Sequence, residues 1–353
     1  MFKRGFSMKP LPVVDISYRP LHEIAMGPLK AALLNLAIDL NIFDKLTQPV
    51  VSEDVAANLN TDIGNTERFL NALATLDLLE KKNGHYQNRP LADTFLVSTA
   101  SSYIAPLLKQ IGDERLNPLA QLSQLVKNGP LEIEDQPDFS DPSIWAKEAQ
   151  IAAGWALGGV GQLVADVLSG LPGFSRFEKM LDLGCGHGMF SLYALDRHPS
   201  LISVLLDRPE VLQTAKMYCD AYEASERIKF LPADYMTDSI CDDPDNGYDL
   251  VYAGATLNFA IHRLDDLISK IHDALKPGGY FVSFQDGMTH ECTRPDTMMG
   301  AVIPAMVSGA DYFFPQGMIA ERAVLCGFQS VRSKTVSTPA GEMDIDIAQK
   351  AKE

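Results

Sequence analysis

Apolar residues recur at helical spacing in the first part of the chain. The stretch 29–46 (LKAALLNLAIDLNIFDKL) repeats them every three or four positions, which predicts an amphipathic helix. Ser52, followed by two acidic residues, predicts the N-cap of a second, short helix. A third helix is expected to begin at Asn65 and to run to about residue 80. A turn at 81–84 then predicts a short β-ribbon followed by a helix.

The pattern changes after residue 143, where short apolar strands alternate with segments of helical length. Five strands separated in this way predict a parallel, doubly wound α/β sheet. Two further strands are separated only by residues 337–341, which predicts an antiparallel hairpin at the end of the sheet. The seven predicted strands carry the sequences KMLDLG, SVLLD, IKFLPAD, YDLVYAG, GYFVSF, SVRSKTV and MDIDIAQ.

These two patterns predict two domains. Three helices and a ribbon form the pattern of a winged helix, and the acidic, proline-containing segment 131–143 (LEIEDQPDFSDPS) is expected to be a linker. We therefore expect an N-terminal helical, winged-helix domain over residues 1–143 and an α/β domain over residues 144–353. The uncharged stretch 149–165 contains glutamines and several glycines, and it predicts a buried amphipathic helix rather than a membrane span.

Composition narrows the class of protein. The 353 residues include 46% apolar and 22% charged side chains, which is typical of a globular protein. A net charge of −16 counts against nucleic acid and anionic membrane surfaces as partners. Five scattered cysteines without a CxxC pair exclude a disulfide framework, and no cluster of ligand residues predicts a metal site. The N-terminus is a poor signal peptide, so we expect a cytoplasmic location.

A winged helix often binds DNA, but this one is acidic. Residues 52–97 contain seven acidic and four basic side chains, and the presumed recognition helix, 66–80, has one arginine against three acids. This balance favours packing against protein. A regulator that binds a cofactor and acts through its winged helix remains the alternative from another class.

The segment 181–190 (LDLGCGHGMF) joins an apolar strand to a helix through three glycines. Gly184, Gly186 and Gly188 form G-x-G-x-G, whereas a dinucleotide fingerprint needs its third glycine at position 189, which is Met189. No Gly-Lys-Ser/Thr follows, so the segment is not a phosphate-binding loop of the P-loop type. The turn still lets a ligand approach the backbone closely.

Acidic residues at the ends of three successive strands indicate the kind of ligand. Asp182 lies beneath the glycine turn, where it suits an ammonium group. Asp207 ends the next strand and suits a ribose diol, and Asp234, beside Tyr235 and Met236, suits an adenine. Ammonium, ribose and adenine together describe S-adenosylmethionine.

The motifs that support this interpretation also carry a family resemblance. They are DLGCGHG, LLDRPEV, PADYM, ALKPGG at 274–279 and CGF at 326–328. With them the chain resembles a class I S-adenosylmethionine-dependent methyltransferase. More narrowly, it resembles the dimeric small-molecule O-methyltransferases of plants and bacteria, which have an N-terminal winged-helix dimerisation domain.

The resemblance implies a Rossmann-like, seven-stranded sheet whose last strand is antiparallel. It also implies S-adenosylmethionine as cofactor, S-adenosylhomocysteine as product, a homodimer formed through the N-terminal domain, and a small, largely apolar acceptor methylated at oxygen. The residues assigned to cofactor binding are Asp182, Gly184, Gly186, Asp207, Asp234 and Tyr235.

The chain departs from the family at its general base. Members usually place a histidine after the fourth strand, and here the matching residue is Asn258, which cannot accept a proton at neutral pH. His262, one helical turn further on, is a candidate for a displaced base, with a surface or capping role as the alternative. An acceptor that loses its proton readily, including sulfur, nitrogen or carbon, and a reaction without methyl transfer also remain open.

Several residues are candidates for the acceptor site. Trp155, Tyr193 and the apolar stretch 298–314 (MMGAVIPAMVSGADYFF) are expected either to line an acceptor pocket or to belong to the core. Gln285 and Asp286, at the end of the fifth strand, are candidates for facing the acceptor. His187, inside the glycine turn, is expected to have a structural role.

Overall fold

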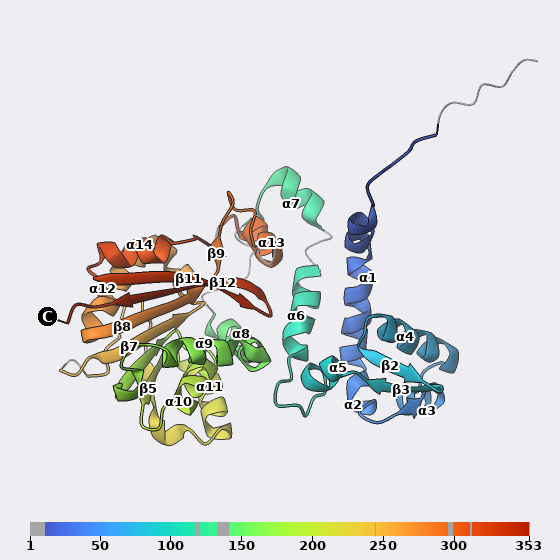
Figure 1. Ribbon diagram of the computed structural model, residues 1–353, viewed down its shortest axis with the longest axis horizontal. Helices are drawn as coiled ribbons and strands as arrows, with labels where there is room; N and C mark the ends of the chain where they lie inside the picture. Colours follow the sequence, from blue (N-terminus) through green and yellow to red (C-terminus); the bar gives the residue numbers. More distant parts are fainter. Residues whose placement is uncertain are drawn as a thin grey trace, which may run out of the picture. The chain divides into compact units, whose positions relative to one another are not determined.

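The computed structural model describes residues 11–116, 121–132, 141–243, 245–295, 299–310 and 313–352. The chain divides into two compact units, Met1–Ala92 and Asp93–Glu353, which are considered separately below (Figure 1). The domain boundary predicted at residue 143 stays a prediction. Most of the expected linker lies outside the described residues.

The first unit consists of four helices and a three-stranded sheet in the order β1-β3-β2. Phe43 and Leu70 on the helices and Tyr86 on the ribbon are fully buried, and Tyr86 OH donates a hydrogen bond to Asn71 Oδ1. Its elements are α1 (Arg19–Asp39), α2 (Ile42–Lys45), β1 (Val50–Val51), α3 (Ser52–Leu59), α4 (Ile63–Thr75), β2 (Leu79–Lys82) and β3 (His85–Asn88).

The helix boundaries in this unit differ from those predicted. The helix expected over 29–46 begins ten residues earlier and is interrupted at Asn41, which has a left-handed backbone (φ 49°). Ser52 is the first helical residue of α3 and does not cap it. The third helix begins at Ile63 rather than Asn65, because the side chain of Asp62 accepts a hydrogen bond from Asn65 N at 2.8 Å and caps it.

The second unit is built on a seven-stranded sheet in the order β11-β12-β8-β7-β4-β5-β6. Adjacent strands from β8 to β6 are parallel, and β12 runs antiparallel to both of its neighbours. This confirms the predicted fold class. The strands are β4 (Lys179–Leu183), β5 (Ile202–Asp207), β6 (Ile228–Pro232), β7 (Tyr248–Gly254), β8 (Leu275–Gln285), β11 (Ser330–Thr338) and β12 (Gly341–Gln349).

Helices cover both faces of this sheet because alternate strand residues point to opposite sides. Met180 and Leu205 face one helical layer, whereas Leu181 and Val204 face the other (Figure 1). The first layer contains α8 (Pro142–Trp155), α9 (Gly161–Ser169), α10 (Met189–Asp196) and α11 (Pro209–Ala221). The second contains the 3₁₀ segment Leu257–Arg263, α12 (Leu264–Ala274) and α14 (Met318–Leu325).

Shorter elements complete the chain. A two-stranded ribbon pairs Phe314 with Gly287 and lies beyond the end of β8. The remaining elements are α5 (Pro90–Phe95), α6 (Ala105–Leu116), α7 (Leu122–Asn128), the 3₁₀ turns Phe174–Arg176 and Ser225–Arg227, β9 (Gly287–Met288), α13 (Met299–Ser308) and β10 (Phe314–Pro315).

One helical run in the described chain, Ser143–Ser169, is long and apolar enough to cross a membrane. Its inward residues belong to the core of the first helical layer, including Ala153, Val160 and Leu168. The run is also interrupted by a π-helical turn, Ala156–Val160, in which Gly159 has φ 117°. These contacts are those of a core helix, as predicted for 149–165.

Candidate functional site

The glycine turn between β4 and α10 lies at the carboxyl edge of the sheet. Gly184 and Gly186 have left-handed backbones (φ 64° and 54°), which side chains rarely adopt. A Cβ on Gly184 would overlap Thr256, so the turn packs directly against the segment after β7. At Gly186 the nearest atom to such a Cβ is that of Ala149, at 3.8 Å, so the backbone there can be approached closely.

Asp182 lies in β4 beneath this turn and is almost fully buried. Its Oδ2 accepts a hydrogen bond from Ser191 Oγ at 2.8 Å, and burial raises the pKa of its carboxyl group to about 7. The hydrogen bond from Ser191 opposes this rise in pKa, and the charge of Asp207 contributes to it. Tyr252 OH, also buried, has no hydrogen-bond partner in the described chain. A cation at the turn would stabilise the ionised form of Asp182.

Asp207 is the last residue of β5 and is fixed against the glycine turn. Its Oδ2 accepts a hydrogen bond from Gly186 N at 2.9 Å, and its Oδ1 accepts one from Arg208 N at 2.8 Å. Burial raises the pKa of this carboxyl group, while the two backbone N–H groups lower it. Each oxygen keeps a further lone pair, so the carboxylate can also accept hydrogen bonds from a diol.

Asp234 and Tyr235 follow β6 and differ in exposure. The exposed Asp234 lies two residues beyond the strand, and its Oδ1 accepts a hydrogen bond from Met236 N at 2.8 Å. The phenol of Tyr235 lies 3.0 Å from Thr256 Oγ1, and burial raises its pKa to about 12. No pattern in the sequence indicates Thr256, which joins Tyr235 to the glycine turn.

The two catalytic candidates lie in the 3₁₀ segment after β7. Oδ1 of Asn258 is buried and has no hydrogen-bond partner in the described chain. The side chain of His262 is exposed. Buried acceptors are normally paired, so the unpaired amide oxygen of Asn258 is a candidate for contact with a ligand.

Gln285, predicted as a candidate for facing the acceptor, contacts the backbone instead. When its amide oxygen faces the segment after β7, Oε1 accepts hydrogen bonds from Ala255 N at 3.1 Å and Thr256 N at 3.2 Å. The side chain is almost fully buried. Gln285 therefore supports the segment that carries Asn258.

The aromatic and histidine candidates form a packed cluster. The Trp155 ring lies 5.4 Å from that of Phe284 and 6.2 Å from that of Phe190, measured between centroids. His187 is buried against Phe190, its Nδ1 accepts a hydrogen bond from Met189 N, and burial lowers its pKa to about 4. The imidazole is therefore neutral at pH 7 and holds the start of α10.

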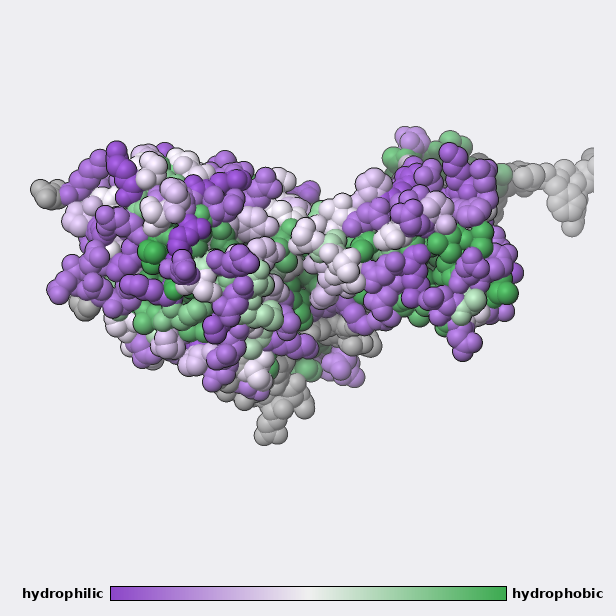
Figure 2. All heavy atoms as spheres, turned by 90° about the horizontal axis from the view of Figure 1, so that it is seen from below, coloured by the Kyte–Doolittle hydropathy of each residue, from purple (hydrophilic) through white to green (hydrophobic). Residues whose placement is uncertain are grey.

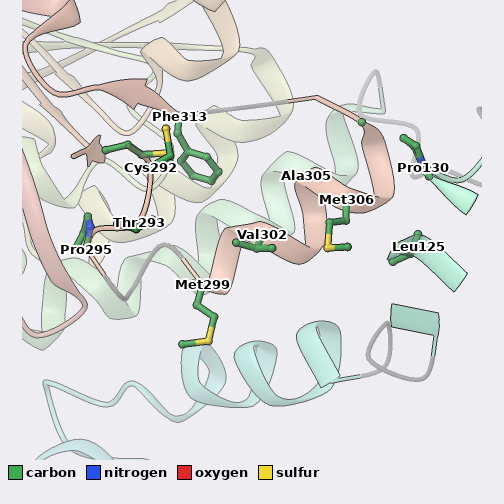
Figure 3. Close-up of a pocket in the computed structure, with 13 residues that line it drawn as sticks. Leu125, Pro130, Cys292, Thr293, Pro295, Met299, Val302, Ala305, Met306 and Phe313 are labelled. Atoms are coloured by element: carbon green, nitrogen blue, oxygen red, sulfur yellow. The ribbon is translucent and has the colours of Figure 1, made fainter. Parts of the chain in front are cut away.

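An apolar groove of about 720 Å³ lies beside α13 (Figure 3). Figure 3 shows Met299, Val302 and Met306 on α13, with Leu125 of α7 across from them. Among the residues that the structure describes, no charged side chain lines the groove. Trp155 and Tyr193 do not line it either, and Tyr193 packs against Gly161. Met298 lies outside the described residues. The lining residues are Leu125, Gly129, Pro130, Met288, Cys292, Thr293, Pro295, Met299, Val302, Ala305, Met306, Gly309 and Phe313.

The described residues fit S-adenosylmethionine better than a metal ion. They contain no group of three or more histidines, cysteines or acids that could hold a metal. The turn at Gly186 leaves room for a ligand against the backbone, and two acidic side chains, Asp182 and Asp207, adjoin it. This is a suitable environment for a cationic nucleoside.

Comparison with known proteins agrees with this chemistry. Residues 23–98 match the family model of the O-methyltransferase dimerisation domain, and residues 180–279 match that of a methyltransferase domain. The tetracenomycin polyketide synthesis 8-O-methyl transferase TcmO of Streptomyces glaucescens is 26% identical over 90% of this chain and 93% of its own. The N,N-dimethyltransferase OxyT of Streptomyces rimosus is 26% identical over 81% and 83%.

A solved structure shows the same fold. Human N-acetylserotonin methyltransferase, crystallised in complex with S-adenosylmethionine, has a TM-score of 0.76 at 23% identity and covers 96% of this chain and 99% of its own. The two matched domains identify the family, and the solved structure shows the fold. The chain belongs to the class I S-adenosylmethionine-dependent methyltransferases that carry an O-methyltransferase dimerisation domain before the catalytic sheet.

Proposed function

We propose that this methyltransferase acts on oxygen in a small, largely apolar organic acceptor. The observation that carries the proposal is the pairing of an acid-lined glycine turn with a groove of about 720 Å³ in the same unit, whose described lining residues carry no charge. A groove of this size suits a drug-sized molecule with few charges. Its three methionines can adapt to the shape of a bulky ring system.

Six residues are assigned to the cofactor. Gly184 and Gly186 let the backbone approach it, Asp182 offers charge to its ammonium group, and Asp207 accepts hydrogen bonds from the ribose hydroxyls. Asp234 and Tyr235 adjoin the adenine. The geometry supports these roles because Asp207 accepts a hydrogen bond from Gly186 N. The carboxylate assigned to the ribose therefore lies directly beside the glycine turn.

The chain's own contribution to methyl transfer is mainly positioning. When bound, S-adenosylmethionine would supply an electrophilic methyl group. A C–O bond to the acceptor would form as the C–S bond breaks, S-adenosylhomocysteine would be the product, and the acceptor's proton would pass to water. Asn258 orients the acceptor through its unpaired Oδ1, which accepts a hydrogen bond from the acceptor's hydroxyl group before that group loses its proton. An acidic phenol or enol loses its proton without a strong base, which fits an asparagine at this position.

The acceptor atom is open to direct test. The relatives are named for both oxygen and nitrogen methylation, so sulfur, nitrogen and carbon acceptors remain the alternatives to oxygen. A phenol and an isosteric aniline of the same ring system should be incubated with enzyme and cofactor. Mass spectrometry should show a gain of one methyl group on the phenol and equimolar S-adenosylhomocysteine. Turnover of substrate without S-adenosylhomocysteine would overturn methyl transfer.

Two variants separate the catalytic candidates. Asn258→Ala should lower kcat by about tenfold or more with little change in cofactor affinity, because it removes only orientation of the acceptor. The exposed His262 should tolerate His262→Ala within about threefold. A loss of 10²–10⁴ in His262→Ala would instead identify it as the general base.

The cofactor assignment is tested by calorimetry. Asp207→Ala should abolish measurable S-adenosylhomocysteine binding, because it removes the ribose acceptor and releases Gly186 N. Asp238→Ala is the matched control, since that carboxylate is exposed and its printed partners, Asp234 N and Thr237 Oγ1, lie in the same loop. Unchanged affinity in Asp207→Ala would contradict the ribose assignment.

We also propose a homodimer formed through the first unit. Several large apolar side chains on and before α1 are exposed, and Figure 2 shows hydrophobic residues, in green, on the surface among hydrophilic ones, in purple. The matched dimerisation domain begins within α1, at residue 23. A second copy of the chain is the occupant that we propose for this surface.

A further inference from the structure

The groove beside α13 has a helix on each side, and the C-terminal ends of these two helices lie close together. Helix α7 ends at Asn128, and α13 ends at Ser308. Figure 3 shows Leu125 and Pro130 across from Met306 of α13. The distance between the two helices therefore affects how large a molecule the groove accepts.

A glycine and a proline lie against each other at these helix ends. Gly309 follows α13 directly, has a left-handed backbone (φ 71°), and donates a hydrogen bond from its N–H to Ala305 O at 2.8 Å. A Cβ on Gly309 would lie 2.7 Å from Pro130 Cγ and 3.3 Å from Pro130 Cβ. Carbon atoms in contact are normally farther apart than the first of these distances, so a residue larger than glycine would push the two helix ends apart.

A backbone hydrogen bond joins the same two helix ends. Leu131 N donates to Val307 O at 3.0 Å. The last carbonyl groups of a helix have no partner within the helix, so this bond satisfies one of them from the chain that follows α7. The junction of α7 and α13 therefore combines one polar contact with the apolar contact between Gly309 and Pro130.

The junction belongs to the groove and is separate from the cofactor residues. Both Gly309 and Pro130 line the groove, whereas Gly186 and Asp207 do not. Gly186 and Asp207 instead lie together at the carboxyl edge of the sheet, joined by their own hydrogen bond. A change at the junction should therefore alter the groove and leave the cofactor residues in place.

We propose that Gly309 and Pro130 determine the size of acceptor that the groove selects, because their contact fixes the separation of α7 and α13. With glycine at position 309, the helix ends meet at the proline ring, and the groove stays narrow enough to contact an aromatic alcohol of two fused rings on both sides. A larger residue would widen the groove and favour bulkier ring systems. The inference rests on the proposed acceptor groove, and its experiment separates the failure of the groove from the failure of this contact.

Two fluorescent aromatic alcohols test the proposal: 1-naphthol, with two fused rings, and 9-phenanthrol, with three. Each is titrated into the full-length protein saturated with S-adenosylhomocysteine, so that no methyl transfer occurs. The quantity compared is the dissociation constant of 1-naphthol divided by that of 9-phenanthrol. Gly309→Ala should raise this ratio about threefold or more, because the smaller probe no longer contacts both walls. The affinity for S-adenosylhomocysteine, measured by calorimetry, should not change.

Gly317→Ala is the matched control for backbone strain. Gly317 precedes α14, has φ 84°, and has no atom within 4 Å of the position of a Cβ. It does not line the groove. Alanine at this position therefore has the same left-handed strain without the contact, and the ratio of dissociation constants should remain that of the wild type.

Pro130→Ala tests the contact from its other side and introduces no left-handed alanine. Pro130 is exposed, and the substitution removes its Cγ, which is part of the groove wall. The ratio should rise in this variant too, whether or not Gly309→Ala folds. Gly309→Ala should then change the ratio less in the Pro130→Ala background than in the wild type, because the atom that it would meet is gone.

Three results would overturn the role of this contact. They are a wild-type ratio in Pro130→Ala and in Gly309→Ala, an equal effect of Gly309→Ala in both backgrounds, and an equal effect of Gly317→Ala. A different result would contradict the acceptor groove itself, and the inference with it: the wild-type protein, saturated with S-adenosylhomocysteine, would bind neither probe.

Discussion

Among the single residues of the site, Asp182 has the clearest pH-dependent effect on stability. Its pKa is raised from 3.8 to about 7 by burial, so the folded protein binds its proton more tightly than the unfolded chain. This group therefore stabilises the fold fully below about pH 4, and the contribution is lost as the pH rises through 7. Asp182→Asn should remove that loss.

Thermal unfolding without cofactor at pH 5 and pH 8 measures this effect. The melting temperature of Asp182→Asn should exceed that of the wild type at pH 8, and the difference should be smaller at pH 5. Asp234→Asn alters an exposed carboxylate in the same site, and its melting temperature should equal that of the wild type at both pH values. The same pH response in the wild type and in Asp182→Asn would contradict the role of burial.

The same carboxyl group should couple cofactor binding to pH. A ligand that places an ammonium group near Asp182 favours its ionised form, so binding releases a proton when the pH is below about 7. We expect S-adenosylhomocysteine to bind more weakly at pH 6 than at pH 8 in the wild type. In Asp182→Asn the affinity should be lower at both pH values and should depend less on pH. Calorimetry in buffers of different ionisation enthalpy would count the proton released.

Site residues whose positions follow from the strand pattern could be predicted from the sequence. Residues whose role depends on which strands are neighbours in the sheet could not. Asp182 and Asp207 could be placed because each lies at or near the end of an apolar strand. Thr256 could not, since its contact with Gly184 requires knowing that β4 and β7 are neighbours. Gln285 was correctly placed at the end of its strand. Its hydrogen bonds to the backbone of Ala255 and Thr256 could not be predicted, because they also depend on which strands are neighbours.

At the scale of elements, strands were easier to predict than helix ends. The strands of the large sheet were found because each is a short apolar run bounded by polar turns. Helix α4 begins at Ile63, two residues before the predicted start. Asp62 and Asn65 are both residue types that favour an N-cap, so the sequence alone does not distinguish between them. The π turn after α8 has no sequence signal beyond two adjacent glycines.

The junction between β4 and the segment after β7 yields a prediction for an element contact. Gly184→Ala introduces a Cβ that overlaps Thr256, in addition to the left-handed strain that any alanine has there. Gly84→Ala is the matched control, because Gly84 has φ 80° but no atom within 4 Å of a Cβ. Denaturant unfolding should show a loss of about 1 kcal/mol for Gly84→Ala and clearly more for Gly184→Ala. Equal losses of unfolding free energy in the two variants would mean that Thr256 moves aside without cost.

At the scale of the whole molecule, the surface of the first unit argues for self-association. Leu21, Ile24, Leu29 and Leu36 of α1 are between 46% and 74% exposed, and at 100° per residue they fall on one side of the helix. Only Ala37 and Ile38 of this helix are buried. A helix of 21 residues with so little of its apolar surface covered needs a partner, and the matched dimerisation domain indicates a second copy.

Charge placed on this helix should therefore separate the copies without unfolding either unit. Leu21→Glu combined with Ile24→Glu replaces two exposed apolar side chains, so each chain loses no core packing. A dimer, in contrast, would bury two unpaired acids from each copy at a cost of several kcal/mol. Light scattering after size exclusion should give the mass of one 38.7 kDa chain for this variant and twice that for the wild type. Val324→Glu, at a residue of α14 that is 58% exposed, is the control and should remain dimeric. A dimeric double variant with unchanged circular dichroism would place the interface elsewhere. A wild-type monomer would mean that this apolar face serves a different partner.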